Sequence, residues 1–147
     1  MFQRVLVPLD DSPLSDRMLE AGVAMARAFE ARLSLLKAYN WSERFAMVDT
    51  PTVEVVKDEG HSEEAQARAF LEERAVRLRE AGLTVDTVVL DASPGRAILD
   101  ESEREPGTLI VIGTHERGWL ARLLKGSTLQ DVLHDVHVPM LIIREGG

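Results

Sequence analysis

Short apolar runs alternate with longer amphipathic stretches along this chain. The runs are rich in branched aliphatic residues and cover residues 5–9, 33–36, 109–112 and 140–143, while residues 83–90 first alternate and then run apolar. Runs of this kind are typical of strands that are buried on both faces of a sheet. After the first run, apolar side chains recur at helical spacing in a stripe formed by Leu14, Met18, Ala21, Met25 and Phe29. Strands that alternate with helices predict an α/β fold, with a parallel sheet and helices on both of its faces.

Serine–proline pairs mark two expected helix starts. Ser12–Pro13 and Ser93–Pro94 each combine a hydroxyl N-cap with proline at the first helical position. A further helix is expected to open at Ser62 and to end before Gly82. Residues 40–61 show no clean period and include a proline and a glycine, so we expect them to form a long connection.

The composition narrows the class of protein. The 147 residues include no cysteine, which excludes a disulfide scaffold, a thiolate metal site and a cysteine nucleophile. The net charge of −8 argues against a nucleic-acid partner, which would need a basic face. We see no signal peptide and no apolar run of the roughly 18 residues that a membrane helix needs, so we expect a cytoplasmic protein without a membrane partner. The length fits one domain over residues 1–147.

Two segments follow strands at the place where a ligand is expected. Ligands of parallel α/β sheets bind beyond the carboxyl ends of the strands, where the strand order reverses. Pro8–Leu9–Asp10 follows the first strand, and residues 113–127 follow the fourth strand and lead into a final helix near Ser127.

The second segment combines features that suit a polyphosphate. Its glycines let the backbone approach phosphate oxygens, and the helix start offers free N–H donors. Hydroxyl and cationic side chains gather in the same stretch: Arg117, Arg122, Lys125, Ser127 and Thr128. A plain loop with a glycine turn and a helix cap would show the same residues, so the residues alone leave both interpretations open.

The stretch from Val111 to Ser127, VIGTHERGWLARLLKGS, resembles the signature loop of the universal stress protein family. In nucleotide-binding members of that family the pattern is glycine, two residues, glycine, nine residues, glycine and then serine or threonine. Gly113, Gly126 and Ser127 match this pattern, whereas Glu116 stands where the second glycine is expected.

Other segments resemble the family in the same order along the chain. They are residues 5–10, 35–38, 92–98 and 138–143. In the third of them, Pro94 and Ile98 match the family's Gly-x-Pro-x-x-x-Ile, with Ala92 in place of the glycine. The resemblance therefore extends over nearly the full length of the chain.

The resemblance implies a fold, a ligand and a site. The fold is a five-stranded parallel sheet in the order 3-2-1-4-5, of the adenine nucleotide alpha-hydrolase-like type. The ligand is ATP or another adenine nucleotide, with Mg²⁺ as a candidate companion ion. Asp10 would face the adenine–ribose part, and Ala38 would lie near the base. The nucleotide-binding residues that the resemblance implies are Pro8, Leu9, Asp10, Ala38, Gly113, Thr114, Arg117, Arg122, Gly126, Ser127 and Thr128.

The last strand is the expected contact of a homodimer. Residues 140–143 are apolar throughout, and the order 3-2-1-4-5 places them at an edge of the sheet. An apolar edge with unpaired backbone groups is an aggregation hazard unless something covers it. A second copy can pair with residues 140–144 about a two-fold axis, as similar family members do.

Some of these side chains have a second interpretation. Asp10 could cap the adjacent helix, and the loop cations could lie on a solvated helix face. His115 has no partner acid or nucleophile in the sequence, so we assign no catalytic residue. His134 and His137 are spaced i, i+3 without an evident third ligand, so we expect no metal site.

Three functions follow from these observations. The first is a nucleotide-binding regulatory protein of the stress response, in which occupancy changes what the dimer does. The second is a dimeric interaction module of the same family that has lost nucleotide binding. The third is an enzyme, at most a slow ATPase or a hydrolase, which we rank last because no motif places a general base. Glu116 is the residue that separates the first two functions.

Overall fold

The computed structural model describes residues 1–41, 53–114 and 134–144. Its elements along the chain are β1 (Arg4–Pro8), α1 (Leu14–Phe29), β2 (Arg32–Ala38), α3 (Val53–Glu80), β3 (Val85–Leu90), α4 (Pro94–Ser102), β4 (Thr108–Thr114) and β5 (Met140–Arg144). All paired strands run parallel, in the order β3-β2-β1-β4-β5. The predicted α/β fold and strand order are therefore confirmed.

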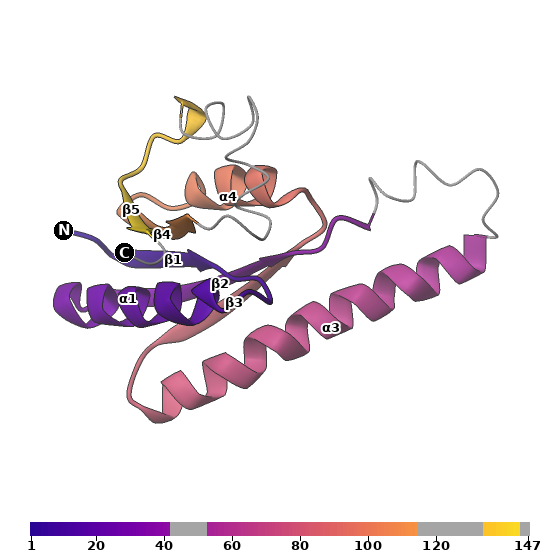
Figure 1. Ribbon diagram of the computed structural model, residues 1–147, viewed down its shortest axis with the longest axis horizontal. Helices are drawn as coiled ribbons and strands as arrows, with labels where there is room; N and C mark the ends of the chain where they lie inside the picture. The colour runs from indigo at the N-terminus through magenta and orange to yellow at the C-terminus, as the bar shows by residue number, and fades with distance from the viewer. Residues whose placement is uncertain (42–52, 115–133, 145–147) are drawn as a thin grey trace.

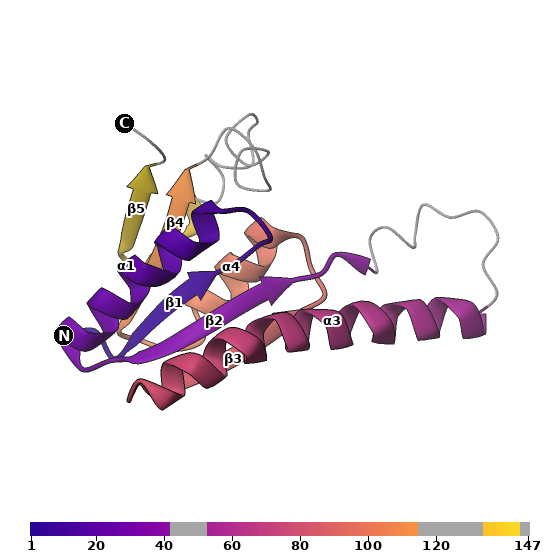
Figure 2. The same cartoon turned by 60° about the horizontal axis from the view of Figure 1, so that its bottom comes forward.

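The helices cover both faces of the sheet. Figures 1 and 2 show α1 and α3 on one face and α4 on the other. The central strand β1 is buried along its whole length, and Val5, Leu6 and Val7 are fully inaccessible to solvent. A strand covered on both faces gains from apolar side chains at every position, which explains why the strands read as continuous apolar runs.

Helix α1 packs closely against the middle of the sheet because two glycines leave room for it. A Cβ atom on Gly22, in the helix, would lie 2.5 Å from Cγ2 of Val7 on β1. A Cβ atom on Gly113, in β4, would lie 2.6 Å from Cδ2 of Leu14 and 2.9 Å from Sδ of Met18. Side chains at either glycine would push the helix away from the strands.

Helix α3 is longer than the sequence suggested. It begins at Val53, so the expected connection over residues 40–61 is wrong for residues 53–61, and Ser62 lies inside the helix. Glycine at position 60 costs about 1 kcal/mol in a helix, but the helix continues through it. At this point the helix passes Trp41, whose ring would lie 3.3 Å from a Cβ atom on Gly60.

The carboxyl-terminal end of α3 agrees with the sequence, which predicted that the helix ends before Gly82. Gly82 has φ +93°, and the N–H of Leu83 donates to the carbonyl of Leu78, the arrangement of a Schellman cap. Figures 1 and 2 show the amino-terminal part of α3 extending beyond the sheet. Among the helices that the structure describes, none is long and apolar enough to cross a bilayer.

The two serine–proline pairs behave differently from the expected hydroxyl caps. The first helix begins at Leu14, one residue later than predicted, and the Ser12 side chain makes no capping bond. Pro94 is the first residue of α4, as predicted, but the Ser93 side chain also makes no capping bond. The carbonyl of Ser93 accepts the N–H of Ala97 instead. Proline therefore locates the helix starts without help from the hydroxyls.

A buried ion pair ties α4 to the amino-terminal end of the sheet. Arg4 on β1 is 1% exposed, and its Nη2 lies 2.6 Å from Oε1 of Glu101. The Arg4 Nη1 donates to the Glu101 carbonyl, and Nε donates to Oγ of Ser34 on β2. Removing one member of such a pair leaves a buried charge without its partner, which typically costs about 3–5 kcal/mol.

Strand β5 forms one edge of the sheet, as predicted. It pairs with β4 from Ile110↔Met140 to Thr114↔Arg144. On β5, Ile142 is 46% exposed, one of the few large apolar side chains with such exposure among the described residues.

We predict that Gly22→Ala destabilises the fold by about 1–3 kcal/mol, because the added methyl overpacks against the stiff, buried Val7. Helix propensity alone would predict the opposite sign, a gain of about 0.5–1 kcal/mol. Urea denaturation measures the difference. Glu20→Ala, at an exposed position of the same helix, is the control and should stay within about 0.5 kcal/mol of wild type. A Gly22→Ala protein more stable than wild type would contradict this account of the α1 contact.

Candidate functional site

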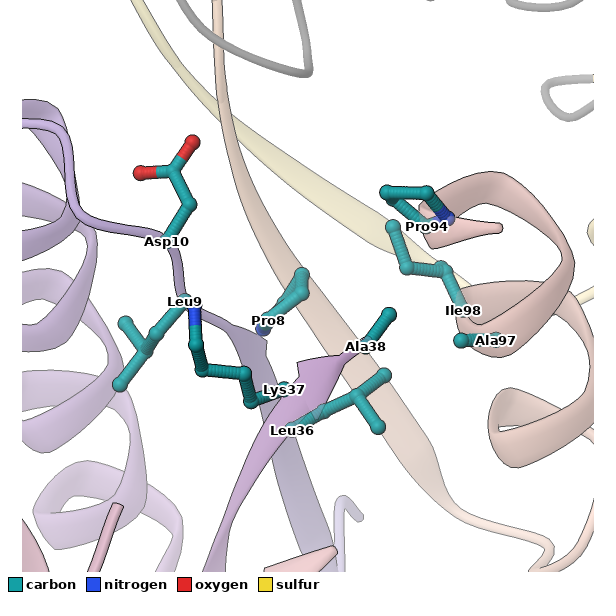
Figure 3. A pocket seen from close by; sticks show the side chains of 9 residues that line it. All are labelled: Pro8, Leu9, Asp10, Leu36, Lys37, Ala38, Pro94, Ala97 and Ile98. Atoms are coloured by element: carbon teal, nitrogen blue, oxygen red, sulfur yellow. The ribbon is translucent and has the colours of Figure 1, made fainter. Parts of the chain in front are cut away.

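A pocket opens at the carboxyl ends of β1 and β2, beside the start of α4. Figure 3 shows the side chains that line it: Pro8, Leu9, Asp10, Leu36, Lys37, Ala38, Pro94, Ala97 and Ile98. Its volume is about 150 Å³. An apolar cavity of that size holds one benzene-sized ring.

The floor and one wall of the pocket are apolar and rigid. Leu36 and Ala38 point from β2 towards α4, while Pro94, Ala97 and Ile98 face them from the helix. Leu36, Ala97 and Ile98 are at most 2% exposed, so they are held by core packing. A flat apolar ring fits between such surfaces and gains from leaving water.

The pocket exists because β1 stops pairing before its neighbours do. The N–H of Leu9 donates the last bond to β2, at the carbonyl of Leu36. The backbone N–H and C=O groups of successive strand residues point to opposite neighbouring strands. Leu9 points to β2, so the backbone of Pro8 points to β4. Proline has no N–H to offer there, and the pairing of β1 with β4 ends at Leu6↔Ile110. The strands therefore separate at the point where the strand order reverses.

This early end leaves one peptide edge of β2 open. The N–H of Tyr39 donates to Leu90 on β3, so the N–H and C=O of Ala38 face the β1 side. Within the described residues, neither group of Ala38 has a hydrogen-bond partner. A donor and an acceptor therefore stand side by side at the rim of an apolar pocket.

Asp10 supplies the acidic group of the site. Its Oδ1 accepts bonds from the backbone N–H of Ser12, at 2.8 Å, and from the hydroxyl of Ser15, at 2.9 Å. The turn into α1 thus holds the carboxylate in one orientation. Figure 3 shows the carboxylate above the pocket, with one oxygen towards the start of α1 and the other away from it. The expected helix cap is therefore wrong, because the N-cap position of α1 is Pro13 and has no side-chain bond. The ligand contact of Asp10 stays a prediction.

Lys37 carries its charge away from the apolar pocket. Its side chain points to the Leu9 side of β2 in Figure 3, and its Nζ lies 4.5 Å from the centre of the Phe70 ring on α3. There it lines a second hollow of about 330 Å³, which also contains Tyr39 and Phe70. Burial, and next the carboxylates of Glu64 and Asp91, raise the pKa of Tyr39, so its phenol stays protonated.

The structure brings together four of the residues implied by the resemblance: Pro8, Leu9, Asp10 and Ala38. Gly113 and Thr114 form the last two residues of β4. The remaining ones lie outside the described residues, together with Glu116, Lys125 and the start of the final helix: Arg117, Arg122, Gly126, Ser127 and Thr128.

The packing of α1 requires glycine at position 113, which the sequence did not reveal. Its φ is not positive, and it lies inside the strand, paired with Ile143. The absence of a side chain makes room for Leu14 and Met18 of α1. The packing of α1 therefore requires this glycine whatever the following loop binds.

Sequence reasoning missed three lining residues, Leu36, Lys37 and Ala97. Pro94 and Ile98 carried the resemblance but were not assigned to the site. Positions 94, 97 and 98 have the spacing of one helix face, and Leu36 and Ala38 share one face of β2. These two spacings would have predicted the apolar lining of the pocket, had it been known that α4 and β2 face each other.

Comparison with known proteins identifies the family. The universal stress protein family matches residues 1–144. The chain belongs to the universal stress protein family.

Individual relatives support this assignment at moderate identity. A universal stress protein of Thermus aquaticus is 31% identical over 98% of this chain and 100% of its own length. Universal stress protein YxiE of Bacillus subtilis is 28% identical over 98% of this chain and all of its own. Universal stress protein Rv2005c of Mycobacterium tuberculosis is 31% identical over 96% of this chain, which spans 45% of that longer protein.

Solved structures share the fold. Universal stress protein UspA from Lactobacillus plantarum has a TM-score of 0.76 at 23% identity, covering 97% of this chain and 98% of its own. A universal stress protein in complex with cAMP has a TM-score of 0.68 at 23% identity, covering 99% and 98%. The protein from Archaeoglobus fulgidus in complex with dAMP has a TM-score of 0.57 at 18% identity, covering 97% and 98%.

Proposed function

We propose that this protein is a regulatory binding protein of the stress response that takes up an adenine nucleotide at the β1–β2 pocket. The observation that carries the proposal is the open donor–acceptor pair of Ala38 beside an apolar pocket of ring size. In this proposal occupancy of the site, rather than turnover, is the functional event, and the protein acts in the cytoplasm.

In this proposal the adenine base is recognised by the shape of the pocket and by the unpaired backbone groups of Ala38 on β2. Adenine presents a ring-nitrogen acceptor next to an amino donor. The N–H and C=O of Ala38 form the complementary pair, and the faces of the ring lie between β2 and α4. A site that pairs both groups rejects rings that lack them, because the unmatched peptide groups would lose water without gaining a bond.

The sugar and the phosphates extend from this pocket. Asp10, at its rim, is placed to accept a bond from a ribose hydroxyl. The phosphates are assigned to the loop after β4, whose sequence supplies two arginines, Lys125 and the hydroxyls of Ser127 and Thr128. ATP is the proposed ligand, with Mg²⁺ offsetting part of its charge.

Two structural neighbours bind small adenine nucleotides. One is a universal stress protein in complex with cAMP, and the other is an Archaeoglobus fulgidus family member in complex with dAMP. These complexes support the proposed ligand class for this chain.

A second candidate function rests on Glu116. This carboxylate stands where nucleotide-binding members have glycine, and it would repel a triphosphate. A member that has lost the nucleotide would act as a dimeric interaction module. In both functions we propose a homodimer joined through residues 140–144, because β5 is an edge strand with Ile142 46% exposed.

We predict that calorimetric titration detects ATP binding, and that Mg²⁺ makes it tighter. Ala38→Leu should weaken binding at least about tenfold, since the larger side chain points into the pocket. Ala69→Leu, the same change at an exposed position of α3, should leave the affinity unchanged. If neither heat nor a thermal shift appears at millimolar ATP, with and without Mg²⁺, the nucleotide proposal fails and the interaction module remains.

We predict that light scattering gives twice the chain mass of 16.3 kDa and that Ile142→Lys shifts the protein towards monomer. The lysine places a charge in the proposed apolar contact, where it has no partner. Val76→Lys is the matched control, because Val76 on α3 has the same exposed fraction of 46%. A dimer that survives Ile142→Lys with unchanged stability would place the interface elsewhere.

A further inference from the structure

Arg4 connects the three elements that form the candidate pocket. The residue lies on β1, its Nε donates to Oγ of Ser34 on β2 at 3.0 Å, and its Nη2 donates to Oε1 of Glu101 on α4 at 2.6 Å. The side chains of Arg4 and Glu101 are 1% and 5% exposed, so these bonds are shielded from water. The pocket lies at the opposite ends of β1 and β2, and the same helix forms one of its walls.

One face of α4 carries both the pocket wall and the anchored carboxylate. Positions 94, 97, 98 and 101 follow the spacing of a single helix face. Pro94, Ala97 and Ile98 line the pocket, and Glu101 lies about 5 Å further along the helix than Ile98. Helix α4 has only nine residues and moves as one body. The place where Glu101 is held therefore determines where the pocket wall stands.

A charged anchor fixes this position more tightly than apolar packing does. Hydrophobic contact is non-directional, so a short helix can shift along an apolar surface as long as the same area stays buried. Charge-assisted hydrogen bonds keep a narrow range of lengths and angles, and they weaken steeply when they are misaligned. Apolar residues of similar volume often replace a buried ion pair without loss of stability, so stability alone does not explain a pair at this place.

We propose that the Arg4–Glu101 pair sets the distance between α4 and β2, and thereby the fit of a flat ring in the pocket. Both are positioning residues, because they act on the ring only through the pocket wall. The ring lies between Leu36 on β2 and Ile98 on α4, which face each other across the pocket. The inference rests on the proposed function for the identity of the ring, whereas the position of the wall can be measured without a ligand.

The test replaces the anchor without leaving a polar side chain unpaired. The triple variant Arg4→Met, Ser34→Ala, Glu101→Leu substitutes apolar side chains for the ion pair and removes the hydroxyl that would lose its donor. This variant should unfold at the urea concentration of wild type or above it. The Kd of AMP, measured by calorimetry, should nonetheless rise at least about fivefold, because the pocket wall is no longer held at one distance from β2.

A second measurement follows the wall itself. The nuclear Overhauser effect between the methyl groups of Leu36 and Ile98 falls steeply with their separation, and it should be weaker in the triple variant without any ligand. The matched control is Arg96→Met with Asp100→Leu, which replaces an ion pair of the same helix whose side chains are 66% and 52% exposed. This control should keep both the wild-type Kd and the wild-type methyl signal.

Glu101→Asp gives an independent result if the triple variant does not fold. It keeps the negative charge beside Arg4 but shortens the side chain by one methylene, so α4 must move to keep the bond. The Kd of AMP should rise at least about threefold, and the Leu36–Ile98 methyl signal should change with it. Thermal denaturation confirms that the variant is folded.

A folded triple variant with the wild-type Kd and the wild-type methyl signal would overturn the positioning role, and so would a folded Glu101→Asp protein that matches wild type in both. A change in only one of the two measurements would also overturn the inference, because the fit of the ring would then not depend on the wall. Absence of AMP binding to the wild-type protein at the millimolar level would instead remove the proposed function. The methyl signal would then decide by itself whether the pair positions α4.

Discussion

The close contact between α1 and the centre of the sheet determines how the rest of the structure is arranged. Gly22 lets the helix lie against Val7 of β1, and Gly113 lets β4 accept Leu14 and Met18. These contacts hold the start of α1 near the carboxyl end of β1. The chain must therefore turn out of the sheet directly after β1, and the turn through Asp10 and Ser15 accomplishes this within a few residues.

The early end of β1 leaves backbone N–H and C=O groups of β2 unpaired in the middle of the parallel sheet, within the described residues. Proline at position 8 ends the pairing of β1 with β4, and the turn ends its pairing with β2 after Leu9. Strand β2 continues to Ala38 because β3 still pairs with it. One peptide edge is thereby left open next to the start of α4, and backbone geometry rather than a reactive side chain defines the candidate site.

The sequence predicted the architecture well because strands buried on both faces leave continuous apolar runs. Asp10 was expected at the ligand crevice because it follows the first strand, and Ala38 because of the family resemblance, and both line the pocket. The sequence misplaced the start of α3, because residues 40–61 show no clean period and include glycine at position 60, although the helix continues past Trp41. Local propensity does not register such a packing contact.

Interactions between distant parts of the chain could not be foreseen in the same way. The buried pair of Arg4 and Glu101 joins residues 97 positions apart, and neither has an unusual local context. Likewise, Gly113 looked like the first residue of a phosphate loop, whereas its lack of a side chain is already required by α1. Both depend on which faces meet in three dimensions, and a single sequence does not contain that information explicitly.

The central claim is that the open edge of Ala38 receives the base, and amide chemical-shift mapping tests it most directly. A ¹⁵N–¹H spectrum titrated with AMP reports each backbone N–H separately. The account predicts that the Ala38 amide moves strongly downfield as its N–H acquires an acceptor, with smaller shifts at Asp10 and Ile98 around the pocket. Shifts that saturate elsewhere, for example around Phe70 in the second hollow, while the Ala38 amide stays in place, would contradict it.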